Sequence, residues 1–160
     1  MPKYRLLTHD ELMEFEKEFI EFLVVNGITA PDWEKMKKEN SDEGVKIIGS
    51  FSDVIMEGTM RKIEFLESRS RNEVRTYQCL PEKIVLMALR ADGDEVDFTT
   101  QEGMLQAMEN PPQNLEVYTS EKKYTGVREH ELFAMTQQGC LVCQGDLFKT
   151  LALALAESKG

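Results

Sequence analysis

Apolar residues recur with helical spacing over residues 8–60. The first predicted helix follows Thr8 and carries its apolar side chains on one face: Leu12, Phe15, Phe19, Phe22 and Leu23. Thr8 and Glu11 are spaced as in a capping box, in which each side chain accepts a hydrogen bond from a free backbone amide of the first turn. The pair Asn26-Gly27 is a typical stop. The pattern therefore predicts one helix between these two signals.

Two further helices are predicted before residue 62. Pro31 falls in the first turn of a short helix, where its missing N–H costs nothing, and Trp33 and Met36 would face inward. A longer helix starts at Ser41, with inward residues Val45, Ile48, Phe51 and Ile55. Each glycine inside a helix costs roughly 1 kcal/mol relative to alanine. We therefore expect a kink or break at the glycines of this helix: Gly44, Gly49 and Gly58.

From residue 62 onward the period changes from helical to alternating. Strands are predicted over residues 62–65, 74–80, 83–91 and 115–118, and Asp92-Gly93 predicts a hairpin that leads into a strand over 95–98. Thr99 and Glu102 have capping-box spacing before a short helix that carries Met104, Leu105 and Met108, and further helices are expected over 129–138 and 147–157. The pattern predicts an α+β fold: N-terminal helices, a central, mostly antiparallel sheet of about four to five strands, and C-terminal helices. No Pro/Gly/Ser-rich linker divides the chain, so we expect a single domain over residues 1–160.

Composition indicates the cellular compartment and excludes some classes of partner. The 160 residues carry a formal net charge of −10, which phosphate backbones repel, so we expect no nucleic-acid partner. The longest apolar stretch, 147–156, is too short to cross a bilayer, and the N-terminus has no apolar signal segment, so we expect no membrane association. Three cysteines, an odd number, argue against a disulfide framework and favour the cytoplasm.

The pair Cys140 and Cys143 is the one local motif with chemical potential. A C-x-x-C pair serves redox chemistry best at a helix N-terminus after a βαβ unit, and neither context is predicted here. A structural zinc site needs four ligands, and only Cys79 and His130 remain to complete such a set. We regard this tetrad as a candidate metal site, but burial of the two cysteines beside Leu141 and Val142 is the favoured interpretation. No cofactor is predicted.

Other polar clusters give no catalytic arrangement. The acidic run over residues 92–97 lacks the glycine and glutamate positions of an EF-hand loop, so a solvated hairpin tip explains it better. Glu16 projects beside the apolar face of the first helix and is either at its edge, paired with a cation, or a general acid of raised pKa. Phosphate-binding, dinucleotide-binding, zinc-protease and nucleophile-elbow motifs are absent. No catalytic residue is therefore predicted, and we lean against an enzyme.

Several segments carry a resemblance to a known family. The opening Met1-Pro2-Lys3-Tyr4-Arg5-Leu6-Leu7-Thr8, the segments over residues 18–28 and 32–35, and the later segments 51–53 and 61–66 resemble a small family of uncharacterised bacterial proteins. That family is a domain of unknown function. The resemblance implies a free-standing bacterial protein and supplies no activity, cofactor or site residue.

Three hypotheses on function follow. The leading one is a non-catalytic cytoplasmic module that binds another protein or itself, since no catalytic constellation exists and nine methionines offer adaptable contact surface if they are exposed. The second is a small enzyme or metabolite-binding domain with a site between the sheet and the N-terminal helices, near Tyr77, Arg75, Trp33 and Glu16. The third is a zinc- or thiol-dependent protein that uses Cys140 and Cys143.

Overall fold

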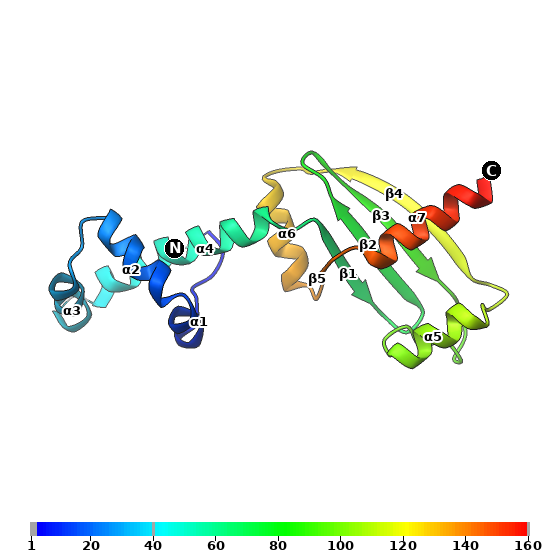
Figure 1. Cartoon of the computed structure of the whole chain (residues 1–160), viewed down its shortest axis with the longest axis horizontal. Coiled ribbons are helices and arrows are strands. Elements are labelled where there is room, and N and C mark those ends of the chain that lie inside the picture. Colours follow the sequence, from blue (N-terminus) through cyan, green and yellow to red (C-terminus); the bar gives the residue numbers. More distant parts are fainter. Residues whose placement is uncertain (1–2, 40, 160) are drawn as a thin grey trace. The chain divides into compact units, whose positions relative to one another are not determined.

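The computed structural model describes residues 3–39 and 41–159, and it divides the chain into two compact units, Met1–Arg61 and Lys62–Gly160 (Figure 1). The first unit is helical, and the second holds a five-stranded antiparallel sheet with helices of its own. The predicted α+β class is therefore confirmed. That residues 1–160 form one domain stays a prediction.

The first unit contains α1 (His9–Glu14), α2 (Glu16–Val25), α3 (Ala30–Glu39) and α4 (Ser41–Arg61). The capping box at Thr8 and Glu11 is confirmed, because both of its hydrogen bonds are present. The single first helix is wrong: the backbone leaves helical geometry at Phe15, with φ −101° and ψ 25°, so α1 and α2 are separate. Gly27 ends α2 with φ +72°, as its sequence position indicates.

No break occurs in α4, which runs without interruption through all three of its glycines. A Cβ on Gly44 would lie 3.8 Å from the Trp33 ring, an ordinary van der Waals distance, so Trp33 of α3 packs over this part of α4. Phe51 of α4 is buried between the rings of Phe19 and Phe22, at centroid distances of 5.0 and 5.4 Å. Tertiary packing thus outweighs the low helix propensity of glycine.

The second unit is built on β1 (Phe65–Arg69), β2 (Glu73–Cys79), β3 (Lys83–Arg90), β4 (Glu116–Lys123) and β5 (Leu141–Cys143). These strands lie in the order β4-β3-β2-β1-β5, and every neighbouring pair is antiparallel. The strand expected at 62–65 starts only at Phe65, and β5 was not expected at all. The last strand therefore pairs with the first, across most of the unit's sequence.

The predicted hairpin at Asp92-Gly93 and the strand over 95–98 are wrong, because residues 91–98 form an irregular loop. The Asn72 side-chain amide donates to the Ala91 and Gly93 carbonyls at 2.7 and 2.9 Å, which binds the loop to the β1–β2 turn. Phe98 is fully buried in the core. The alternating apolar residues of this segment therefore fill the end of the core instead of extending the sheet.

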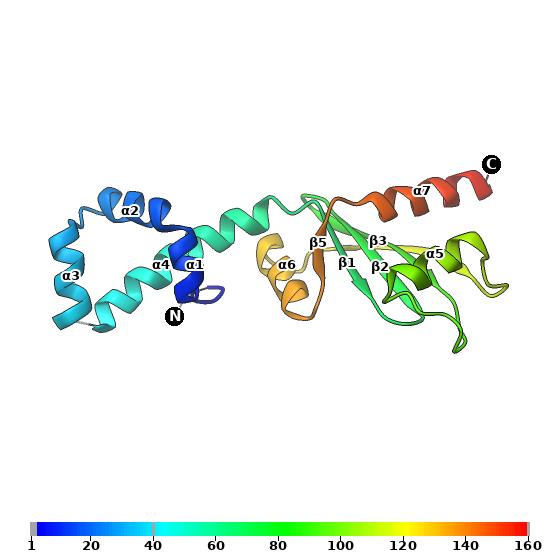
Figure 2. The same cartoon turned by 60° about the horizontal axis from the view of Figure 1, so that its bottom comes forward.

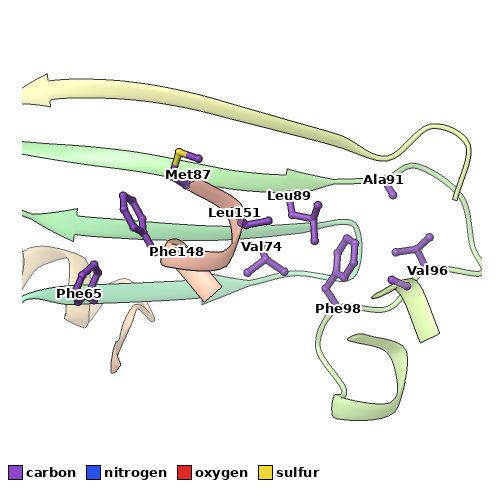
Figure 3. Packing of buried hydrophobic residues seen from close by; sticks show 10 residues of the cluster. Phe65, Val74, Met87, Leu89, Ala91, Val96, Phe98, Phe148 and Leu151 are labelled. Carbon is purple, nitrogen blue, oxygen red and sulfur yellow. The ribbon is translucent and has the colours of Figure 1, made fainter. Parts of the chain in front are cut away.

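Three helices complete the unit: α5 (Gln101–Glu109), α6 (Arg128–Gln137) and α7 (Asp146–Lys159). Thr100 caps α5 in place of Thr99, and Leu105 and Met108 are exposed whereas Ala107 is buried. α7 packs across β2 and β3, and Figure 3 shows the resulting cluster. Its largest members include Phe65, Met87, Leu89, Phe98, Phe148 and Leu151. Within the described part of the chain, no helix has the length and apolar character of a membrane span.

Candidate functional site

The sheet has one face covered by α7 and one face that solvent reaches. Figure 2 shows α7 along one side of the sheet and α6 at one end of the other side. Side chains alternate along each strand, and the register aligns a row across four strands on the side away from α7: Ser68, Arg75, Ala88 and Tyr118. A second row beside it joins Leu66, Tyr77, Leu86 and Ser120. We call the part of this side formed by Ser68, Glu73, Arg75, Tyr77, Leu86, Ala88 and Tyr118 the open face.

Accessibility within the open face is uneven. Ala88 is fully buried and forms its floor, because its methyl group is too small to rise above the neighbouring strands. Arg75 keeps half of its side chain in water, and Tyr77, Leu86 and Tyr118 are half-buried. The result is a shallow surface with a small centre and large aromatic, aliphatic and cationic side chains around it.

A hydrogen-bonded network centred on Glu73 orders this surface. The Arg75 Nε atom donates to Glu73 Oε1 at 3.0 Å, and the Tyr118 hydroxyl donates to the same oxygen from two strands away. Burial acts to raise the pKa of Glu73, but the bonds from Tyr118 and Arg75 outweigh it and hold that pKa below its ordinary value. The bond to Glu73 also raises the pKa of Arg75. Both groups stay charged near neutral pH, so the network fixes the two side chains.

A cavity of about 260 Å³ opens where the open face meets the β1–β2 turn. Two arginines and two hydroxyls line it with Glu73: Arg69, Arg75, Ser68 and Ser70. Each arginine is already paired with a glutamate two residues earlier on its strand, Arg69 with Glu67 at 2.8 Å and Arg75 with Glu73. An anionic ligand would therefore compete with these internal carboxylates.

Arg128 of α6 closes the opposite end of the open face. Its side chain is 14% exposed, and its guanidinium donates to the carbonyl oxygens of Ile63, Cys79 and Leu80. The Tyr124 hydroxyl donates to the Leu80 carbonyl as well, at 2.8 Å. These bonds satisfy carbonyls at the ends of β2 and of the segment before β1, so Arg128 has a structural part in holding α6 against the sheet.

The structure does not gather the predicted metal ligands around one point. Cys79 is buried at the end of β2, and His130 is exposed on α6. The side chain of Cys143 joins the cluster under α7, whereas the Cys140 side chain lies beside Ser68 of the open face. The two cysteines of the motif thus lie on opposite sides of the sheet. Among the described residues, no three His, Cys, Asp or Glu side chains are placed to hold a metal ion.

The three thiols are also poorly suited to nucleophilic chemistry. Burial raises the pKa of Cys79 to about 12, and it raises the pKa of Cys140 and of Cys143 above the ordinary value. The reactive form of cysteine is the thiolate, which a raised pKa disfavours at neutral pH. Only Cys79 is buried: Cys140 and Cys143 are half-buried beside the exposed Leu141 and Val142, so the expected burial of this segment in the core is wrong.

The other residues singled out in the sequence fall in different places. Arg75 and Tyr77 both lie on the open face, whereas Trp33 and Glu16 belong to the first unit, where Glu16 is exposed at the start of α2. The acidic loop lines a cavity of about 630 Å³ through Asp92, Asp94 and Glu95. Glu73 and Tyr118 were missed. The alternation Glu73-Val74-Arg75 places opposite charges on one strand face and was a usable signal for Glu73, but Tyr118 joins it only through the register.

A helical unit followed by an antiparallel sheet with α7 on one face defines an α+β protein. The chain belongs to the family of unknown function DUF6495, whose family model matches residues 1–156. The expected membership of a family without assigned activity is thereby confirmed, and a bacterial origin stays a prediction. A search of curated proteins and a search of solved structures found no match.

Proposed function

We propose that the protein is a non-catalytic binding module of the cytoplasm that contacts another protein through the open face. The observation that carries this proposal is the fixed display of Arg75, Tyr77 and Tyr118 around the small buried Ala88. Tyrosine and arginine dominate the energetics of protein interfaces, because each covers a large area and keeps a polar group for orientation. The network on Glu73 holds these side chains before any partner arrives, which lowers the entropy cost of binding.

The surroundings of the open face agree with a protein partner. Glu73 and Glu116 balance Arg75 and Arg90 in one region of the sheet, so the surface is mixed in charge. A mixed aromatic surface suits a folded protein better than a phosphate backbone, which the net charge of −10 would repel. The three free cysteines fit a reducing compartment.

Site-specific photo-crosslinking in cells of the source organism tests the proposal. Tyr77 is replaced by photoreactive benzoylphenylalanine, and the matched control carries the same group at Leu105, which is 56% exposed on α5. We expect a discrete adduct with one protein from the first variant only. The same adducts from both positions, or none from either, would remove the open face as a contact surface.

Once the partner is known, variants of Tyr118 test the energetics. Tyr118→Ala removes the ring and should weaken binding about 30-fold, which corresponds to the roughly 2 kcal/mol cost of truncating a hot-spot residue. Tyr118→Phe keeps the ring and loses only the bond to Glu73, so its effect should be several-fold smaller. Equal affinity of all three proteins would contradict the proposal.

A second candidate function is binding of an anionic metabolite, and the cavity lined by Arg69, Arg75 and two serine hydroxyls favours it. Calorimetric titration with phosphate and with a dicarboxylate such as succinate tests this candidate. Saturable binding that Arg75→Gln abolishes would support it. Absence of heat at millimolar ligand would remove it and leave the protein-binding proposal untouched.

A further inference from the structure

The phase of β1 determines which peptide groups of β5 remain free. The Cys79 amide donates to the Glu64 carbonyl at 2.8 Å, so even-numbered residues from Glu64 to Ser68 turn their peptide groups toward β2. Odd-numbered residues of β1 therefore bond to β5, and they are paired with Leu141 and Cys143. The peptide groups of the middle residue of β5 point in the opposite direction from those of its two neighbours. Val142 accordingly directs its N–H and C=O away from the sheet, at the open edge.

The side chains at this edge are apolar and accessible. Leu141 is 72% exposed and Val142 is 59% exposed. They lie in the longest uncharged stretch of the chain, residues 132–145, although charged residues make up 30% of the whole sequence. Natural sheets protect their edges with charged side chains, proline or bulges, and β5 has no charge or proline.

The opposite edge of the sheet is protected in the usual way. β4 carries exposed charges along its length: Glu116, Glu121, Lys122 and Lys123. Lys83 of β3 pairs with Glu121 at 3.0 Å and adds to this charged border. The charged β4 edge therefore disfavours pairing with another strand, whereas the uncharged β5 edge permits it.

We propose that two copies of the chain associate through β5, with Val142 of one copy opposite Val142 of the other across a two-fold axis. Antiparallel pairing of a strand with its own copy satisfies both free peptide groups of Val142 at once, and it is self-complementary, as a two-fold interface must be. The exposed side chains of Leu141 and Val142 become covered in the same step. The two sheets then form one continuous sheet.

The symmetry of the free groups favours a second copy over another partner, because the outward N–H and C=O of Val142 are matched by the same residue of another copy. Two copies that each carry −10 repel one another, and this repulsion is least where the surface is uncharged, as it is along β5. A basic partner would be drawn to the acidic segments instead. Because β5 has only three residues, the contact is smaller than a standard interface and the dimer is weak. This inference does not rest on the proposed function.

Sedimentation of the full chain over a range of concentrations tests the dimer. We expect a concentration-dependent monomer–dimer equilibrium that strengthens as salt is raised, because salt screens the repulsion between like-charged copies. Val142→Lys should weaken association at least tenfold, because the two-fold axis sets the two lysine side chains directly opposite one another. Val142→Pro should do the same, since it removes the outward N–H and leaves the bonds to β1 in place. The matched control is Ser120→Lys, which puts the same charge on the β4 edge and should leave the equilibrium unchanged.

Several results would overturn the proposal. A monomer at all concentrations and salt levels would do so, as would a dimer that Val142→Lys leaves intact. Equal weakening by Ser120→Lys would also contradict it, since that outcome assigns the effect to overall charge. Val142→Thr keeps the branched shape and the backbone, so loss of its dimer would count against strand pairing too. Hydrogen exchange confirms that each variant keeps the native sheet.

Discussion

Gly145 and Phe65 pack so closely that no side chain fits between them: a Cβ on Gly145 would lie 2.5 Å from Cγ of the Phe65 ring. Gly145 also has φ +82°, a backbone conformation that favours glycine. Phe65 is buried under α7, where it packs on Phe148 with ring centroids 5.6 Å apart. The start of α7 is therefore set directly on the ring that anchors β1.

Gly145→Ala should destabilise the second unit by roughly 3 kcal/mol, from backbone strain together with a clash in a packed core. Gly139→Ala is the matched control, because Gly139 has φ +111° but nothing within 4 Å of its added Cβ. It should cost roughly 1–2 kcal/mol from strain alone. Hydrogen exchange of the β1 and β2 amides in urea measures both. Equal losses would show that the contact with Phe65 is unimportant.

Arg5 and Glu11 should make the first unit sensitive to acid. The hydrogen bonds from Arg5 and from the Thr8 amide lower the pKa of Glu11 from 4.5 to about 2. A pKa that is lower in the folded state adds stability above the unfolded pKa, and this stability is lost as the pH falls from about 4.5 toward 2. Urea unfolding followed by the fluorescence of Trp33, the single tryptophan, should show a smaller acid loss in Glu11→Gln than in the natural chain.

NMR titration of the Glu11 carboxyl group measures the pairing itself. Arg5→Ala should raise the midpoint toward 4.5, because the largest contribution to the low pKa is the Arg5 hydrogen bond. Arg5→Lys keeps the charge and loses the two-pronged contact, so an intermediate midpoint is expected. A midpoint that is the same in all three chains would refute the role of Arg5.

Arg128 should be more important for stability than a surface arginine. Arg128→Met keeps much of the length of the side chain but leaves the carbonyls of Ile63 and Cys79 without this donor, whereas the Leu80 carbonyl keeps its bond from Tyr124. Since a buried carbonyl without a partner costs about 1–3 kcal/mol, we expect a loss of roughly 3 kcal/mol in the urea unfolding of the second unit. Arg128→Lys should recover only part of it, because one ammonium cannot reach all three oxygens. Full recovery by lysine would mean that charge alone is responsible.

The thiols should behave as packed residues in the native state. Cys79, with a pKa of about 12, should resist iodoacetamide at pH 8 until the sheet unfolds. Mild oxidation should leave Cys140 and Cys143 unbridged within one chain, since they lie on opposite sides of the sheet. Peptide mass spectrometry reads out both results. An internal Cys140–Cys143 bridge, or rapid native labelling of Cys79, would contradict this arrangement.

Local signals in the sequence were sufficient for most of the elements. The hydrophobic period located the helices, and the capping box at Thr8 placed the start of α1 correctly. These local signals failed at positions whose conformation is set by tertiary contacts. β5 is only three residues long, and residues 91–98 alternate like a strand because Val96 and Phe98 fill the core end from a loop. No local pattern distinguishes these cases.

The site was accessible to prediction only in part. Arg75 and Tyr77 were singled out, with Trp33 and Glu16, for a site between the sheet and the N-terminal helices, and the first two lie together on the open face. Tyr118 reaches Glu73 across a sequence separation of 45 residues. Only the register of β2, β3 and β4 brings them together, and register depends on the whole sheet. The separation of Cys140 from Cys143 likewise follows from β5, a strand that was not expected.

The pairing of β1 with β5 has a consequence for synthesis on the ribosome. Translation delivers residues 65–69 long before residues 141–143, so the nascent β1 has one unpaired edge while the rest of the sheet is being made. Phe65 stays uncovered for the same interval, because Phe148 follows later still. A transcript cut short between these segments would yield a polypeptide with a bare aromatic edge, a natural target for chaperones and proteases.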